Sequence, residues 1–178
     1  PVKPVAELYT SLGYSQHGKT NLFRALYRHM ELSNTRFERA RGAREAGLIP
    51  LVDESVRAGG RDGLLVAGID WAKSIPACGQ RLRKCGAGRA DLLLAHNPKA
   101  FVAAEEREIP LTLSGHTHGG QVRLPWFGPP LTFSAVPRRV AAGGLHELGG
   151  RRVYVSRGVG HERGQAPRIR FLCPPEVT

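Results

Sequence analysis

The order of apolar and polar positions along the chain predicts helices in the first quarter and short strands after it. Leu22, Leu26 and Met30 recur at helical spacing in a stretch rich in Arg, Glu, Ala and Leu, which predicts one or two helices over residues 21–45. After this stretch the apolar residues gather in two short runs, 48–52 and 64–67, with a glycine-rich turn at 59–63 between them. These two runs are expected to be strands.

The remainder of the pattern predicts further strands with helices between them. Residues 92–95 and 111–113 read as strands on either side of a helix over 99–107, and a short helix is expected around 80–84. Proline and glycine dominate from about residue 120 to about 150, and two alternating stretches, 152–155 and 168–172, read as half-buried strands. The fold class is therefore α/β, with at least five strands.

Length and composition narrow the class of protein. A chain of 178 residues with 41% hydrophobic residues suits one compact domain with a buried core. No apolar run approaches the roughly 20 residues of a membrane span, and no signal peptide precedes the chain as written, so a cytoplasmic protein is expected. Three cysteines, Cys78, Cys85 and Cys173, are too few for a disulfide scaffold and are expected to be free thiols.

Charge adds little to this picture. Lys and Arg number 26 against 15 Asp and Glu, which gives a formal net charge of +11. The arginines are scattered as short doublets such as Arg138-Arg139, with no aromatic and basic RNA signature beside them. A nucleic-acid partner is therefore possible but not favoured over an arginine-rich composition.

Three histidines stand directly after two of the predicted strands. His96 follows residues 92–95, and His116 and His118 follow Leu111-Thr-Leu-Ser114 within Ser114-Gly-His-Thr-His-Gly-Gly-Gln121. Because loops at strand ends converge on the ligand-binding edge of an α/β sheet, the three imidazoles are expected to meet there. Imidazole nitrogen is a strong ligand for zinc, manganese and iron, so a metal site competes with the ordinary reading of three unrelated histidines.

Two longer segments carry a family resemblance. Leu93-Leu-Ala-His-Asn-Pro98 followed by Leu111-Thr-Leu-Ser-Gly-His-Thr-His-Gly-Gly-Gln-Val-Arg-Leu-Pro125 resembles the calcineurin-like metallophosphoesterases, in particular the small bacterial phosphodiesterases. The resemblance extends over about residues 44–177 and leaves 1–43 diverged within a single domain, 1–178. It implies a sandwich of two sheets flanked by helices, shortened at its N-terminal edge. It also implies two divalent metal ions (Mn, Zn or Fe), with His96 and His116 on one ion and His118 on the other, and hydrolysis of a phosphoester substrate.

Other parts of the family's site have no counterpart in the sequence. The family's Asp-x-His, bridging Asp and Asn-His elements are missing, and His17 is the one histidine near the place where a catalytic histidine would be expected. Arg123 and Arg157 are candidates for substrate binding. Because three neutral imidazoles poorly neutralise two divalent ions, the chain alone is expected to be inactive or weakly active.

Two other readings of the sequence stay open. Residues 13–20, Gly-Tyr-Ser-Gln-His-Gly-Lys-Thr, match the phosphate-binding P-loop pattern and would make the chain a nucleotide-binding protein, although the segment before them reads as a helix and not as the required strand. Alternatively, His96, His116 and His118 could form a non-catalytic mononuclear zinc site.

Overall fold

The computed structural model describes residues 42–86, 89–132, 134–161 and 169–177. The chain divides into two compact units, Pro1–Pro50 and Leu51–Thr178. In the first unit the described part is 42–50, where 42–45 form one helical turn. Among the described residues, the second unit carries the sheet, the longer helices and the three strand-end histidines.

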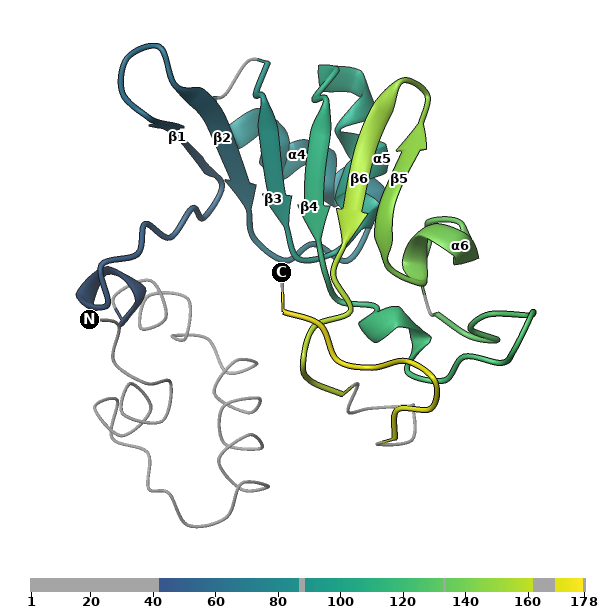
Figure 1. The fold of residues 1–178 in the computed structure, drawn as a ribbon. Helices are drawn as coiled ribbons and strands as arrows, with labels where there is room; N and C mark the ends of the chain where they lie inside the picture. Colours follow the sequence, from purple (N-terminus) through teal and green to yellow (C-terminus); the bar gives the residue numbers. More distant parts are fainter. Residues whose placement is uncertain (1–41, 87–88, 133, 162–168, 178) are drawn as a thin grey trace. The chain divides into compact units, whose positions relative to one another are not determined.

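The second unit is built on one six-stranded sheet (Figure 1). The strands lie in the order β1-β2-β3-β4-β6-β5. Neighbours among β2, β3, β4 and β6 are parallel, and β1 and β5 are antiparallel edge strands. Their bounds are β1 Glu54–Ala58, β2 Leu64–Ile69, β3 Leu92–Ala95, β4 Leu111–Ser114, β5 Gly144–Leu148 and β6 Arg151–Val155. The carboxyl ends of the four parallel strands therefore meet at one edge, where α/β sheets bind ligands.

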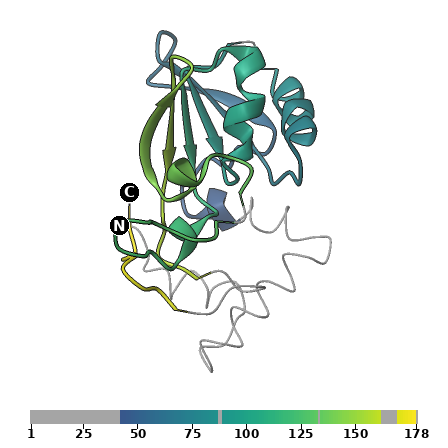
Figure 2. The ribbon, with the colours of Figure 1, turned by 90° about the vertical axis from the view of Figure 1, so that its right-hand side faces the viewer.

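Helices cover one face of this sheet (Figure 2). The two longer ones are α4 Ile75–Lys84 and α5 Lys99–Ala103. The shorter helical elements are the 3-10 turns η1 Glu105–Arg107 and η2 His118–Gly120 and the helix α6 Arg138–Ala141. Helix α4 begins at Ser74, whose hydroxyl accepts a hydrogen bond from the Ala77 N–H at 3.3 Å. Its buried residues, Cys78 and Leu82, are four positions apart, so both lie on the face toward the sheet.

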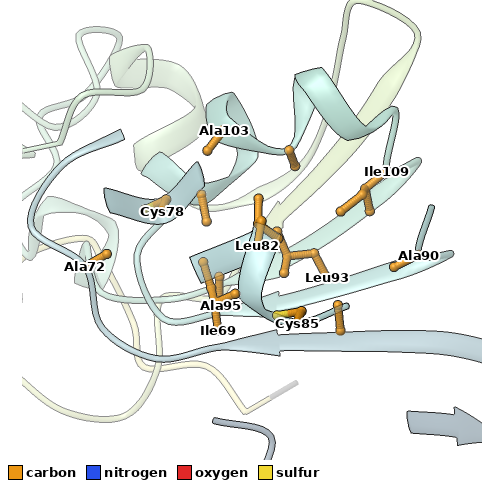
Figure 3. Packing of buried hydrophobic residues seen from close by; sticks show 13 residues of the cluster. Ile69, Ala72, Cys78, Leu82, Cys85, Ala90, Leu93, Ala95, Ala103 and Ile109 are labelled. Atoms are coloured by element: carbon orange, nitrogen blue, oxygen red, sulfur yellow. The ribbon is translucent and has the colours of Figure 1, made fainter. Parts of the chain in front are cut away.

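The core between sheet and helices consists mainly of small side chains (Figure 3). Leu93 is completely buried at its centre, with Leu82 from α4 and Ile109 packed in the same cluster. Seven alanines and two cysteines of this cluster need little space, which lets α4 and α5 lie close to the strands. A second cluster joins Phe101 of α5 to Val153 and Val155 of β6 and to Val140 of α6.

The opposite face of the sheet is apolar but less covered. Leu92 pairs with Leu111 and Leu94 with Leu113, so these four side chains share that face. They are half-buried or exposed, and Leu94 keeps 38% of its surface accessible. The resemblance implies two sheets, and the described residues contain one of them.

Several sequence predictions are confirmed. The α/β class and the minimum of five strands are correct, and β2, β3, β4 and β6 lie where their patterns placed them. The helix expected at 80–84 is the last turn of the longer α4, and the helix expected at 99–107 is α5 with η1. The single-domain organisation stays a prediction.

Other sequence predictions are wrong, or concern residues outside the described part of the chain. Residues 48–52 are not a strand, because the chain pairs with β2 only from Glu54 onward. Of the strand expected at 168–172, the described residues 169–172 make a single bridge, Val122 to Phe171. Both α6 and β5 were missed, because a short helix and an edge strand in a proline- and glycine-rich stretch give little periodicity. Most of the helix expected over 21–45 lies outside the described residues.

No helix among the described residues has both the length and the apolarity that crossing a bilayer requires. The cytoplasmic location expected from the sequence stays a prediction.

The three cysteines are free and buried, as expected. Burial, followed by the nearby Asp53 carboxylate, raises the pKa of the Cys85 thiol to about 11, and burial also raises the pKa of Cys78. Because only the thiolate reacts, we expect iodoacetamide at pH 8 to alkylate Cys85 about 100-fold more slowly than a free thiol. Mass spectrometry of the alkylated peptides measures this rate, with the urea-unfolded chain as the fast control. Rapid labelling of the native chain would contradict the expectation.

Candidate metal centre

The ends of β3 and β4 bring His96 and His116 together. The two strands are parallel neighbours, paired through Leu94 and Leu113, and each histidine lies just past the end of its strand. Beyond the strands the contact continues, because the Gly115 N–H donates a hydrogen bond to the His96 carbonyl at 3.1 Å. The ring centres of His96 and His116 are 5.2 Å apart, with the rings inclined at 63°.

This spacing fits two imidazoles that share one metal ion. An ion bound by an imidazole nitrogen lies about 3 Å from the ring centre, so two rings on a tetrahedral ion have centres about 5 Å apart. The pair supplies nitrogen ligands suited to zinc, manganese or iron. His96 and His116 therefore fit part of a metal coordination shell.

Trp71 packs against both histidines and was missed by the sequence analysis. Its ring centre lies 4.8 Å from that of His116 and 5.8 Å from that of His96. Trp71 follows β2 as His96 follows β3, so the same strand-end argument could have found it. The indole covers one side of the histidine pair and restricts the positions that the two rings can take.

His118 lies in η2, in a backbone segment with an unusual conformation. His116, His118 and Gln121 all have positive φ angles (72°, 50° and 61°), which side chains other than glycine rarely adopt. Gly119 between them also has positive φ, and a Cβ atom there would stand 2.8 Å from the Cys173 Sγ. Such strained positions persist where the surrounding structure enforces them, and they cluster at functional sites.

The C-terminal segment holds this loop in place. The Cys173 thiol donates to the His118 carbonyl at 3.5 Å, and the Arg170 guanidinium reaches the same carbonyl at 3.5 Å. The His118 ring lies beside Gly160, with its Cε1 atom 3.5 Å from the place a Cβ on that glycine would take. Arg170 and Cys173 were not identified from the sequence, because no local pattern marks a contact across more than 50 residues.

The described residues do not form a complete metal site. Among them, no group of three or more His, Cys, Asp or Glu side chains is placed to hold an ion, so His118 does not join His96 and His116 in one shell. Two carboxylates of the second unit have structural partners, Asp53 beside the end of β2 and Asp91 at the opposite end of β3 from His96. Asp53 pairs with Arg81 at 2.5 Å and accepts from the Asp70 N–H at 3.1 Å, and Asp91 accepts from the Leu65 N–H at 2.7 Å.

The two arginines suggested as substrate ligands have different surroundings. Arg157 pairs with Glu176, to which its Nε donates at 2.8 Å and its backbone N–H at 3.1 Å. The Tyr154 hydroxyl donates to the other oxygen of the same carboxylate. Arg123 lines a surface hollow together with Arg138 and Arg139. Neither observation tests a substrate-binding role.

The Glu176 carboxylate is expected to stabilise the fold in a pH-dependent way. Hydrogen bonds from Tyr154 and then from Arg157 lower its pKa from 4.5 to about 2. A carboxyl whose pKa is lower in the folded state contributes its full stability above about pH 4.5, and the contribution is lost as the pH falls through about 2. We expect Glu176→Gln to cost about 1–2 kcal/mol at pH 7 and less in acid.

Urea unfolding at pH 7 and at pH 3 measures this difference. Glu147→Gln is the matched control, because Glu147 is 68% exposed and lies 4.0 Å from its partner Arg152. Equal losses for Glu176→Gln and Glu147→Gln at pH 7 would contradict the expectation.

The remaining sequence candidates lie outside the described residues. His17 and the P-loop-like residues 13–20 both fall in 1–41. Their roles stay predictions.

Comparison with known proteins gives relatives of two kinds. The uncharacterized metallophosphoesterase YkuE of Bacillus subtilis is 35% identical over 117 residues, which is 66% of this chain and 37% of that protein. The phosphodiesterase YaeI of Escherichia coli is 42% identical over 87 residues, covering 49% of this chain and 30% of its own length. The chain thus spans about a third of the length of these curated relatives.

The first residues resemble a different protein. Residues 1–34 match the family model described as isocitrate dehydrogenase kinase/phosphatase (AceK), regulatory domain. In agreement, the isocitrate dehydrogenase kinase/phosphatase of Anaeromyxobacter dehalogenans is 46% identical over 52 residues, 29% of this chain and 8% of that protein. No solved structure matches the chain.

These metallophosphoesterase relatives are of the same kind as the family that the Gly-His-Thr-His-Gly-Gly-Gln segment resembles. The segment follows β4 in the mixed α/β sheet. Over the part that these relatives match, the chain is similar to the calcineurin-like metallophosphoesterases.

Proposed function

We propose that the chain contributes to a metal-dependent phosphoester hydrolase, in which His96 and His116 hold one divalent ion and His118 holds a second. The observation that carries the proposal is the pair of imidazoles 5.2 Å apart at the ends of two neighbouring parallel strands. The similarity to a metallophosphoesterase and a phosphodiesterase supports hydrolysis of phosphoester bonds as the reaction.

In this function the chain's own residues would bind the divalent ion and keep the two histidine rings in position. His96 and His116 offer neutral nitrogen ligands, and the Gly115 hydrogen bond to the His96 carbonyl keeps their two loops together. When bound, a divalent ion polarises a phosphoryl oxygen and lowers the pKa of its bound water. Trp71 shields one side of the pair from water and keeps the two rings in position.

We further propose that the 178 residues alone hydrolyse phosphodiesters weakly or not at all. Three neutral imidazoles bring no negative charge, and two divalent ions at one site need carboxylate ligands. The sequence contains no Asp-x-His and no Asn-His pair to provide the family's other ligands. Among the described residues, Asp53 and Asp91 accept hydrogen bonds within the fold.

The test incubates the purified chain with Mn²⁺ and bis(p-nitrophenyl) phosphate and follows release of nitrophenol. We expect no turnover above that of the metal alone. Turnover that disappears in His116→Ala would overturn the proposed inactivity and support the metal-dependent reaction. Turnover that persists in both His96→Ala and His116→Ala would show that hydrolysis does not depend on the proposed metal ligands.

Metal content separates this function from a mononuclear zinc site, which the His96–His116 pair also favours. About two ions per chain after equilibrium dialysis support a dinuclear centre. About one zinc ion per chain, retained without hydrolysis, supports the non-catalytic zinc site. A chain that binds no metal would contradict both.

A further inference from the structure

A tight hairpin displays a tryptophan on the surface of the second unit. We call residues 124–128 the tryptophan hairpin. Leu124 and Gly128 exchange two backbone hydrogen bonds of 2.9 Å, and the Phe127 N–H donates to the Pro125 carbonyl at 2.7 Å. The segment leads from η2 to α6 and projects from the carboxyl end of the sheet (Figure 1).

The apolar side chains of this hairpin face solvent. Trp126 is fully exposed, and Leu124, Phe127 and the nearby Leu131 are 43%, 56% and 62% exposed. Trp126 also has a φ angle of 60°, a costly conformation for a bulky side chain. Two cross-strand hydrogen bonds hold Trp126 in this conformation, although its exposed side chain gains no stability from burial. The combination points to a function at the surface.

Positive charge surrounds the apolar tip. Arg123, Arg138 and Arg139 line a hollow of about 450 Å³ whose other walls include Trp126 and Phe127. The guanidinium of Arg138 lies 4.5 Å above the centre of the Phe127 ring. The sequence has no Asp or Glu between residues 109 and 146, so no acidic neighbour in this stretch offsets the three arginines.

We propose that the tryptophan hairpin docks on the surface of a bilayer that contains anionic phospholipids. Trp126 and Leu124 enter the boundary between headgroups and acyl chains, where an aromatic ring with a polar edge is favoured. Arg123, Arg138 and Arg139 bind lipid phosphates around the hollow, as guanidinium groups do. This surface is separate from the histidine pair and does not depend on the proposed hydrolysis.

A single-stranded nucleic acid is the other polyanion to consider, since it stacks on exposed aromatic rings between basic residues. Leu124 and Leu131 are aliphatic and offer no such stacking surface, although both are exposed beside the rings. The mixture of aliphatic and aromatic side chains around three arginines therefore favours the lipid surface.

The test is co-sedimentation of the full chain with vesicles of phosphatidylcholine alone or with 30% phosphatidylglycerol, at about 0.1 M NaCl. We expect binding to the anionic vesicles only. Trp126→Asn, which keeps the positive φ easily, is expected to weaken partitioning at least tenfold. Arg138→Ala with Arg139→Ala is expected to weaken it about 25-fold, since each arginine contributes about fivefold near an anionic surface.

Two controls make the result specific. The double variant Arg61→Ala with Arg83→Ala removes the same charge from exposed positions outside the hollow and is expected to keep most of the binding. In a Trp71→Phe background Trp126 is the one tryptophan left, and its emission is expected to shift to the blue on anionic vesicles.

Three outcomes would overturn the proposal. They are equal losses in the two double-arginine variants, an unshifted Trp126 emission, and binding of a single-stranded oligonucleotide by the hairpin without binding of vesicles.

Discussion

Replacing His116 with alanine is expected to weaken binding of Zn²⁺ to the full chain by about 100-fold or more. The reason is the pairing of its ring with that of His96, 5.2 Å between centres, since one imidazole alone loses the chelation that two provide. Loss of groups that only orient metal ligands already costs about 10–100-fold in affinity, and loss of a ligand should cost at least as much. Titration calorimetry with Zn²⁺ measures the affinity directly.

The matched control for this prediction is His146→Ala. His146 lies in β5, where its Nε2 contacts the Gly143 carbonyl at 3.1 Å, away from the parallel strand ends. We expect His146→Ala to leave zinc affinity within about twofold and His96→Ala to reproduce the loss seen for His116→Ala. Similar affinities for the three variants would show that His96 and His116 are not ligands.

Arg170→Ala is expected to lower the free energy of unfolding by about 3 kcal/mol. The guanidinium donates to five backbone carbonyls, those of His118, Arg157, Gly158, Gly160 and Cys173. Each hydrogen bond from a charged group contributes about 1.5–3 kcal/mol, but water replaces part of what is lost because Arg170 is half-buried. Urea unfolding monitored by circular dichroism gives the difference.

Two further variants serve as controls for Arg170→Ala. Arg152→Ala removes a guanidinium that is 65% exposed on β6, and we expect a change within about 0.5 kcal/mol. Arg170→Lys keeps the charge but lacks the planar fork that reaches several carbonyls at once, so an intermediate loss is expected. If Arg170→Ala costs no more than Arg152→Ala, the carbonyl network does not stabilise the fold.

The strands of the sheet centre were predictable because each is a short apolar run with polar or glycine boundaries. Residues 64–67, 92–95, 111–113 and 152–155 all lie in strands, and the strand-end rule places His96 and His116 side by side. Trp71 follows β2 in the same way, but an indole is not a metal ligand, so the search for ligands at strand ends missed it. The edge strands failed because their burial is mixed, as in β1, where an apolar run at 48–52 misled the prediction.

The supports of the histidine loop could not have been predicted from local patterns. Arg170, Cys173 and Glu176 contact His118, Gly119, Arg157 and Tyr154 through hydrogen bonds between residues 13 to 55 positions apart. Such contacts depend on the path of the backbone after β6, where residues 156–161 and 169–177 form no helix or strand. The positive φ angles of His116 and His118 are likewise visible only in three dimensions.

The match of residues 1–34 changes the interpretation of the missing ligands. His17, the candidate catalytic histidine, lies within a stretch that resembles the regulatory domain of isocitrate dehydrogenase kinase/phosphatase. The three candidate metal ligands, His96, His116 and His118, all lie in the second unit.

The contacts beneath η2 also set an order of folding. His118 is synthesised 52 positions ahead of Arg170, which corresponds to about 3–10 s at ordinary rates of synthesis. Parallel strands β3 and β4 can pair in that interval, but the His118 carbonyl meets its two donors only after Arg170 and Cys173 have been made. The histidine loop is therefore among the last parts of the second unit to acquire its final shape, and loop closure across this distance slows that step.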